Sequence, residues 1–467
     1  MAIVNAMVAI ANWFWGVPIL LIIGGGGLYV SLRLGFIQIS RFGYICSQTF
    51  GKMFGKKHTE GISPFQAATV ALASTIGASN IVGVPVAIAL GGPGAILWMW
   101  ILAIIGCGTK FCEVALGIMY REKDSEGNYV GGPFYYCGKG LGGPIGKFLG
   151  IIYAFFLMIE LAPSIATQAA SACNQGVALG INQTVFGIFI AVVVAVVCMG
   201  GIKRIANVTD KMVPLMAGVY LLGALILIFA NIKNLPSAIG MIFADAFTGH
   251  AAVGGFAGST IALALRWGAA RGVYSNEAGL GTAPAAHSAA DVDHPVRQAM
   301  WGVFEVTVDT LIVCTVTGLA ILVTGVWTAD GMLENTGALA QMAYASLFGA
   351  GFGNIFVAVC VFFFVLSTII AVVFYGEKQA EFLFGLKFAK IWRWVYVVAT
   401  VIGGLGINLP TLYALTDFML GLIVVPNMIA VVVLAPKVKK GIDEFFNTPG
   451  KYYLADKAAK AAAKKQA

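Results

Sequence analysis

Long runs of apolar residues, separated by short polar stretches, extend along almost the whole chain. A helix needs about 20 apolar residues to cross a bilayer, and on that criterion the pattern predicts eleven membrane spans. They lie at 16–33, 64–90, 93–120, 148–174, 180–201, 211–231, 256–286, 300–327, 352–375, 391–406 and 410–435. Two weaker apolar stretches, 236–247 and 335–348, are short and carry polar residues, so we expect re-entrant or interfacial helices there.

Two of these spans are interrupted by small and polar residues at matching places in the two halves of the chain. Residues 70–84 are VALASTIGASNIVGV, and residues 264–281 are ALRWGAARGVYSNEAGLG. An unpaired backbone group in lipid costs several kcal/mol, so a helix breaks at membrane depth only where protein or a polar cavity surrounds the break. Paired interruptions of this kind point to the substrate and ion site of a secondary transporter.

The positions of the two interruptions also predict the topology. Five spans separate their starts, and an odd number reverses the direction of the chain through the membrane. We therefore expect an all-α polytopic membrane protein with a five-plus-five inverted repeat and one extra N-terminal helix. Counting core helices from the second span, the interruptions fall in core helices 1 and 6. The predicted parts are an N-terminal segment with the extra helix and a cytoplasmic linker at 1–63, the first repeat at 64–255, the second repeat at 256–435 and a basic cytoplasmic tail at 436–467.

Charge content and distribution give the orientation. Only 11% of the residues are charged, against roughly 25% in soluble domains. The net charge of +8 would suit a nucleic-acid partner, but nearly all basic residues of the predicted loops lie on one side, with the lysine-rich tail. The other side carries Lys233. The positive-inside rule then predicts a plasma-membrane protein with its N-terminus outside and its C-terminus in the cytoplasm. Nucleic acid is excluded as a partner.

Four motifs resemble one known family, the alanine or glycine:cation symporters. They are GGPGAILWMWILAIIG at 91–106, with Leu97 where the family usually has Phe, KFCEVALGIMYR at 110–121, GGPFYY at 131–136 and RGVYSNEAGLGTAP at 271–284. The resemblance covers nearly the whole chain. It implies the leucine-transporter-like fold of the amino acid–polyamine–organocation superfamily, Na⁺ as the coupling ion, and small neutral amino acids, alanine and glycine, as substrates. We expect no organic cofactor and a functional monomer.

The interruption of core helix 1, STIGASN at 74–80, offers groups for both ligands. Unwound N–H groups attract a carboxylate and freed carbonyls bind a cation, while a glycine permits the break and a close approach. We predict substrate contacts at Thr75, Gly77, Ala78 and Asn80. The alternative is a small-residue packing seam between helices. Asn80 could also match a second sodium site of the fold, together with the carbonyl of Thr75, and that question stays open.

Core helix 8 carries two adjacent hydroxyl residues, Ser367 and Thr368, in an otherwise apolar run. Alone, such a pair most often bonds to its own helix. In the fold that the resemblance implies, hydroxyls at this place complete a sodium site with carbonyls of core helix 1. Spacing from Gly77 and Asn80 places those carbonyls at Ala73 and Ile76. Na⁺ suits such an all-oxygen shell.

Core helix 3 has a polar face that consists of Glu160, Ser164, Thr167, Gln168 and Ser171. A polar stripe within a span is expected to face the bundle interior or a water path. We predict a substrate contact at Gln168 and assign no role to Glu160. The alternative is hydrogen-bonded packing against another helix.

In core helix 6, we expect unwinding at Trp267 and Gly268, where the indole would close a small substrate pocket. An aromatic packing ring is the alternative. Asn276 is predicted to cap the inner half-helix and to contact substrate. Arg271 and Glu277 lie further inward, and could pair as an intracellular gate or as a structural bridge.

The paired breaks predict a secondary transporter that works by alternating access, and the family resemblance implies coupling to sodium and import of alanine and glycine. A proton-coupled permease of the same fold is the alternative. It rests on the intramembrane acids Glu305, Asp309 and Asp417, because such acids can relay protons or pair with a lysine. An ion channel is less favoured, because channels need rings of charge or carbonyls along an open pore. The chain has no HExxH or GxSxG motif, so we expect no enzyme. Its eight cysteines, without a CxxC pair, are interpreted as core residues.

Overall fold

The computed structural model describes residues 7–466, with gaps at 8, 12, 54–61, 178, 250–258, 330–335 and 408. Nearly all of the described chain is helical. In the described residues the one sheet is a two-stranded hairpin of β1 (Glu122–Lys123) and β2 (Tyr129–Val130), in which Glu122 pairs with Val130. The all-α class is therefore confirmed. The predicted boundary between the two repeats, at 255/256, falls outside the described residues.

In the part of the chain that the structure describes, six helical stretches are long and apolar enough to cross a membrane, and a bent pair of helices makes a seventh. The helices that form the six are α8 (Ala95–Met119), α10 (Gly143–Val177), α12 (Gly201–Ala230), α16 (Pro295–Val306) with η6 (Thr307–Cys314) and α17 (Thr315–Thr324), α19 (Ala350–Phe384) and α21 (Leu409–Asn447). This supports a polytopic membrane transporter. The count of eleven spans and the inverted repeat stay predictions.

Shorter helices fill in between the long ones, and each predicted span overlaps a helix. They are α2 (Val17–Ile19), η1 (Leu20–Gly25), α3 (Gly26–Arg33), α4 (Ile37–Ser40), α5 (Phe42–Gln48), η2 (Phe50–Lys52), α9 (Pro133–Tyr136), η4 (Cys137–Leu141), α11 (Gln183–Cys198), η5 (Ile232–Asn234), α13 (Leu235–Thr248), α14 (Ile261–Asn276), α15 (Pro284–His287), η7 (Val326–Thr328), η8 (Thr336–Ala338), α18 (Leu339–Phe348), α20 (Leu386–Gly403) and α22 (Tyr452–Gln466).

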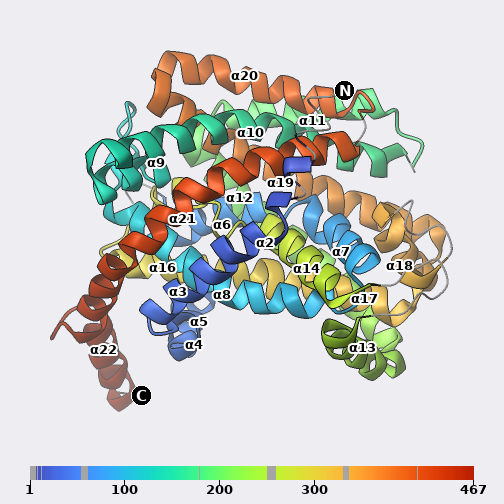
Figure 1. The fold of residues 1–467 in the computed structure, drawn as a ribbon, viewed down its shortest axis with the longest axis horizontal. Coiled ribbons are helices and arrows are strands. Elements are labelled where there is room, and N and C mark those ends of the chain that lie inside the picture. The colour runs from blue at the N-terminus through green and yellow to red at the C-terminus, as the bar shows by residue number, and fades with distance from the viewer. Residues whose placement is uncertain are drawn as a thin grey trace.

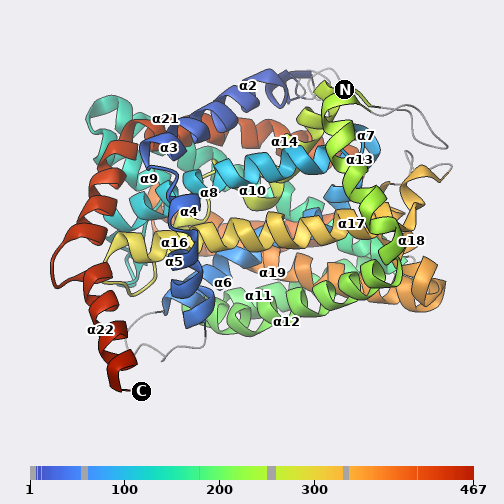
Figure 2. The same ribbon diagram turned by 90° about the horizontal axis from the view of Figure 1, so that it is seen from below.

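The long helices run mainly along the long axis of the molecule (Figure 1 and Figure 2). Helix α22 projects from one end, near α5 and α9, whereas α13 and α18 lie at the opposite end. The last two correspond to the weak stretches 236–247 and 335–348, and both are too short to cross a bilayer.

Core helix 1 is broken where the sequence predicts. Helix α6 (Pro64–Thr75) begins with a capping box, in which the Ser63 hydroxyl accepts from the Gln66 N–H and the Gln66 side chain accepts from the Ser63 N–H. It ends at Thr75, and the chain resumes as the π-helical η3 (Ser79–Gly83) and α7 (Val84–Gly91), with a bend of 46°. Helix α6 packs against α12, α16 and α19, so the break is surrounded by protein.

The predicted unwinding of core helix 6 at Trp267 and Gly268 is wrong, because α14 runs unbroken through both residues to Asn276. Gly268 serves another purpose. A Cβ there would lie 2.4 Å from the Ala95 carbonyl oxygen, so this glycine lets α14 and α8 approach closely. The break comes later, at Glu277, whose φ of 55° ends the helix in the left-handed conformation.

Candidate substrate and cation site

The hydroxyl of Thr368 on α19 meets the carbonyls that the break in core helix 1 sets free. Its Oγ1 lies 3.0 Å from the Ala73 oxygen and 3.4 Å from the Ile76 oxygen. The carbonyl oxygen of Phe364, one turn earlier on α19, is 2.9 Å away. A hydroxyl has one proton to donate, so this cluster holds more oxygen acceptors than Thr368 can satisfy. Such a neutral oxygen cluster suits a hard cation.

Ser367 does not join this cluster. Its Oγ donates to the Phe364 carbonyl at 2.9 Å and lies 3.5 Å from the Met216 sulfur on α12. At 3.6 residues per turn, neighbouring side chains on a helix point in different directions. The carbonyls of Ala73 and Ile76 are thus placed with Thr368, as predicted, and Ser367 faces α12.

The N–H groups at the break are bound by two side-chain amides. Gly77 N donates to Asn80 Oδ1 at 2.9 Å, and Ala78 N donates to Gln168 Oε1 at 3.1 Å. A Cβ at Gly77 would lie 2.7 Å from Thr368 Oγ1 and 3.3 Å from the Gln168 amide. The structure therefore brings together four residues predicted to contact substrate, namely Gly77, Ala78, Asn80 and Gln168. Only a glycine fits at position 77. The Thr75 hydroxyl bonds within α6, to the Ala71 and Leu72 carbonyls.

Asp309, on core helix 7, joins this helix to core helices 1 and 6 next to the break in core helix 1. Its carboxylate accepts from Asn80 Nδ2 at 2.6 Å, from Ser275 Oγ at 2.8 Å and from Thr310 Oγ1 at 2.7 Å. Glu305, one turn earlier, has a different environment. It binds Lys110 Nζ at 3.1 Å and His287 Nε2 at 3.1 Å, all three side chains being fully buried. Of the two acids, Glu305 is thus the one that pairs with a lysine.

Core helix 6 differs from the prediction in its side-chain partners as well. Arg271 contacts Asp417 at 3.5 Å, whereas Glu277 accepts from Thr282 Oγ1 at 2.5 Å and from Ser74 Oγ at 3.3 Å. The predicted Arg271–Glu277 pair is wrong, because the turn at Glu277 directs its carboxylate toward α6. Asn276 ends α14, and its Oδ1 accepts from the Ala278 N–H at 3.0 Å.

Trp267 and Gly268 lie apart from the cluster at the break. Gly268 faces Ala95 and Trp98 of α8. The Trp267 ring lies 5.4 Å from the Arg266 guanidinium and 5.7 Å from that of Arg271. These contacts place the Trp267 ring beside two arginine side chains rather than beside the backbone at the break.

Sequence reasoning missed a second polar centre, which holds the segment after α14. Glu113 Oε1 accepts from Gly279 N at 3.0 Å and from Asn427 Nδ2 at 2.6 Å. The Tyr136 hydroxyl donates to Asn427 Oδ1, and the Asn427 amide reaches the Gly279 carbonyl at 2.8 Å. The signal was present, because Lys110 and Glu113 are charged residues inside an apolar span, and such residues are costly unless they are paired.

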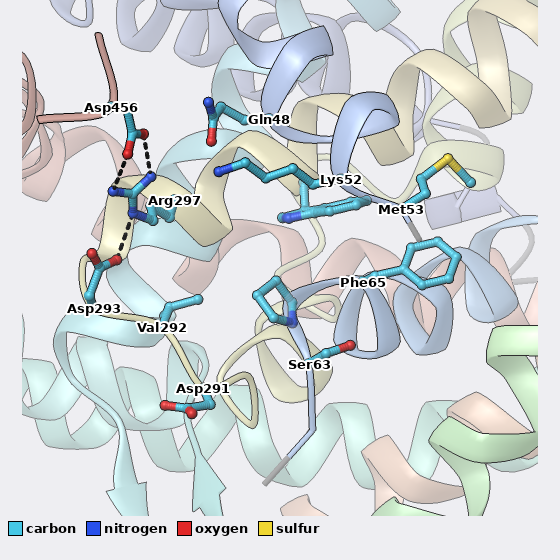
Figure 3. Close-up of a pocket in the computed structure, with 12 residues that line it drawn as sticks. Gln48, Lys52, Met53, Ser63, Phe65, Asp291, Val292, Asp293, Arg297 and Asp456 are labelled. Atoms are coloured by element: carbon cyan, nitrogen blue, oxygen red, sulfur yellow. Dashed lines mark hydrogen bonds and ion pairs between the residues drawn. The ribbon is translucent and has the colours of Figure 1, made fainter. Parts of the chain in front are cut away.

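A cavity of about 640 Å³ lies at the end of the molecule near α22, away from the break in core helix 1 (Figure 3). Arg297 projects along its wall and joins two acids. It binds Asp456 of α22 at 2.8 Å and Asp293 at 2.7 Å. The predicted site residues are absent from its lining. The break in core helix 1 is therefore the candidate site.

Comparison with known proteins identifies the family of this chain. The model of the sodium:alanine symporter family matches residues 1–458. The chain belongs to this family. It is thus a membrane transporter rather than an enzyme. Within the family, the chain is 46% identical to the uncharacterized transporter YflA of Bacillus subtilis over 96% of this chain and 94% of the relative. It is 38% identical to the sodium/alanine symporter AgcS of Methanococcus maripaludis, over 93% and 95%.

Among solved structures, this family member is similar to a mutant of the manganese transporter of Eremococcus coleocola. The TM-score is 0.54 at 12% identity, and the match covers 88% of this chain and 94% of the other. At this identity the similarity concerns the fold alone.

The glycines of the family motifs serve close packing in this chain. A Cβ at Gly94 would lie 2.3 Å from the Ala246 backbone of α13, and one at Gly131 would lie 2.3 Å from the Gly117 carbonyl of α8. A Cβ at Gly281 would lie 2.4 Å from Pro133. These motifs thus join α8, α13 and the segments around the break without room for side chains.

Proposed function

We propose that this family member is a Na⁺-coupled symporter that imports alanine and glycine by alternating access. The observation that carries the proposal is the cluster of Thr368 with the Ala73 and Ile76 carbonyls, directly beside the backbone of Gly77. One unwound segment thus offers oxygen ligands for a cation and N–H donors for a carboxylate. Membership in the sodium:alanine symporter family supports this assignment.

Substrate binding would proceed by exchange of hydrogen bonds. The carboxylate replaces Asn80 Oδ1 and Gln168 Oε1 as acceptor for the N–H groups of Gly77 and Ala78. The released amides are then free to bond the ligand. At the other face of the break, the Ala73 and Ile76 carbonyl oxygens coordinate Na⁺ instead of accepting hydrogen bonds from the Thr368 hydroxyl. The hydroxyl oxygen then turns toward the ion. Because both ligands act on one segment, each should tighten the binding of the other by the same factor.

The proposed pocket is small. Its walls are the backbone at Gly77 and Ala78 with Gln168 and Thr368, which already lie within about 3.3 Å of the position of a Gly77 Cβ. Trp267 and Gly268 are no longer assigned to these walls, and Asn276 is assigned to the turn rather than to substrate. We therefore expect selection of glycine and alanine over leucine by exclusion of volume.

Proton coupling is the second candidate, and Asp309 is the acid that favours it. Glu305 and Asp417 both contact basic side chains, whereas Asp309 accepts from two hydroxyls and an amide. Its contact with Asn80 joins it to the break. A second cation at Asn80 would be a further possibility. The eleven spans, the inverted repeat, the outside N-terminus, the cytoplasmic C-terminus and action as a monomer belong to the same proposal.

The deciding experiment measures binding and uptake of alanine, glycine and leucine with and without Na⁺ at fixed pH. Purified full-length protein in lipid nanodiscs serves for binding, and proteoliposomes serve for uptake. We expect saturable, Na⁺-dependent binding of alanine and glycine and none of leucine. Uptake that continues without Na⁺ and follows the proton gradient would favour Asp309-linked proton coupling. Flux without saturation would instead indicate a channel.

A further inference from the structure

A small cavity of about 30 Å³ adjoins the break in core helix 1. It touches the proposed site at Thr368 and Gln168 and reaches to two acidic residues, Glu160 on α10 and Glu277 after α14. Ser74 and Ser164 also line it. The proposed function gives the two acids no role, so their presence beside the site calls for a separate explanation.

Glu160 is the less satisfied of the two acids. Its side chain is buried, with 1% of its surface exposed, and its Oε1 atom has no hydrogen-bond partner among the described residues. Ser164, one helical turn later, lines the same cavity. A buried carboxylate oxygen without a partner is costly. Because Glu160 lines the cavity, a ligand in the cavity would supply the missing partner.

Glu277 brings a second carboxylate to the same cavity. It adopts a φ of 55°, which is uncommon for a residue other than glycine. This conformation ends α14 and lets the carboxylate accept from both Ser74 and Thr282. The lining of the cavity contains no Lys or Arg in the described residues. Lys110 lies outside it and is held by Glu305. Two acids therefore share a cavity that no described basic side chain lines.

We propose that Glu160 and Glu277 form an inner site for a monovalent cation, next to the Thr368 cluster. This inference rests on the proposed function, since it assigns a second position to a cation that the break has bound. Carboxylate and hydroxyl oxygens are the ligands of hard cations, and Ser74 and Ser164 add hydroxyls to the two acids. The cation is either Na⁺ that leaves Thr368 or the ammonium group of the amino acid. Both are bound by the same chemistry.

The test isolates the inner site by disabling the outer one. Purified full-length protein in nanodiscs is titrated with NaCl against N-methyl-D-glucamine at constant ionic strength, without amino acid, and its melting temperature is recorded. Bound cation raises the melting temperature by mass action. We expect Thr368→Val to retain a Na⁺-dependent rise, with a half-saturating concentration about tenfold above that of the wild type, or about 1.4 kcal/mol. Adding Glu160→Gln should remove this rise.

Methylammonium chloride, titrated in the same variants, distinguishes the two sources. A Glu160-dependent response to Na⁺ alone assigns the site to the coupling ion, and a response to methylammonium alone assigns it to the substrate ammonium. The inference is overturned if neither cation acts on Thr368→Val, or if adding Glu160→Gln leaves the response unchanged. Failure of the proposed function would appear separately, as wild-type protein that binds no alanine in Na⁺.

A second variant protects the test against misfolding of Glu160→Gln. In the Thr368→Val background, Ser164→Ala removes a neutral oxygen from the cavity and should raise the half-saturating cation concentration about two- to threefold. Ser171→Ala is the matched control. It lies two turns further along the same helix face, and its hydroxyl bonds to the Thr167 carbonyl of its own helix. An equal effect of the two serine variants would count against the inner site.

Discussion

The two helix breaks use the same kinds of residue in different ways. In core helix 1, the freed backbone groups bond to side chains of other helices, namely Thr368 and Gln168, and to Asn80. At the end of core helix 6, the chain leaves the helix at Glu277, and the following turn is held by Glu113 and Asn427. Neutral hydroxyl and amide partners can exchange for ligands. A turn held by a buried carboxylate is fixed more firmly, so we assign exchange of backbone hydrogen bonds with ligand to the first break and anchoring of the backbone to the second, where only the Glu277 side chain faces the proposed inner site.

The largest expected effect comes from filling the first break. Gly77→Leu should reduce alanine binding more than about 100-fold, because even its Cβ would lie 2.7 Å from Thr368 Oγ1. Isothermal titration calorimetry on the folded variant measures this loss. Gly272→Ala on α14 is the control, since its Cβ would meet Met99 at 3.6 Å, an ordinary contact. Normal binding by Gly77→Leu would contradict the assignment of the site.

Thr368→Val should have the next largest effect, on the ion rather than on the amino acid. The Na⁺ concentration for half-maximal alanine binding should rise at least about tenfold, while alanine affinity at saturating Na⁺ changes little. A tenfold change corresponds to about 1.4 kcal/mol. Ser367→Ala should change the same concentration less than about threefold, because this hydroxyl faces Met216. If the two variants behave alike, the two hydroxyls act together as the sequence predicts.

Glu113→Gln tests the second break. The amide keeps the shape of the side chain but removes the charge that accepts from Gly279 N and Asn427. We expect a loss of about 1–3 kcal/mol of stability, seen as a lower melting temperature, and a change in alanine affinity of less than about threefold. Glu126→Gln, an exposed acid in the turn of the β hairpin, serves as the control. A large loss of affinity without a loss of stability would show that the second break also binds ligand.

The smallest effect is expected at Asp124, which touches neither break. Burial acts to raise the pKa of this carboxyl, but the hydrogen bond and charge of Lys378 outweigh it and hold the pKa below 3.8. The charged form therefore stabilises the folded protein at neutral pH, and this contribution is lost as the pH falls through the depressed pKa. Asp124→Asn should cost about 1 kcal/mol at pH 7, because the amide keeps the shape of the side chain and Lys378 keeps its ion pair with Glu381. Melting temperatures of the two proteins should converge as the pH falls through that depressed pKa, with Na⁺ and alanine affinities at neutral pH unchanged.

The first break could be predicted from the sequence because its cause is local. Small and polar residues interrupt an apolar run around Gly77. The carbonyls at Ala73 and Ile76 came from the family resemblance, carried over to this chain by their spacing from Gly77. The second break was misplaced because the role of Gly268 depends on a distant partner. Glycine is a poor helix former, yet here it stays helical and packs against Ala95 of α8.

The same distinction applies to the side chains of the site. Gln168 and Thr368 both contact the backbone at the first break. The polar face of core helix 3 indicated Gln168, because a polar residue inside a span is expected to face the bundle interior, and the family resemblance indicated Thr368. The direction of Ser367 depends on the position of Met216 in α12, and the pairing of Lys110 with Glu305 depends on how α8 and α16 are aligned. The sequence of a single helix does not determine its register against another helix.

The contact of Asp456 with Arg297 has a mechanical consequence. Arg297 lies in the first turn of α16, and Asp456 also accepts from the Tyr44 hydroxyl of α5 at 3.1 Å. Helices α5 and α22, from near the two ends of the chain, therefore meet at the N-terminal end of core helix 7. The rings of Tyr452 and His294 add a contact there, 4.5 Å apart. If α16 tilts, α5 and α22 must move with it or lose these contacts. A truncation that removes Asp456 would take from α16 its ion pair with α22, while the packing of α16 against α8 and α6 would remain.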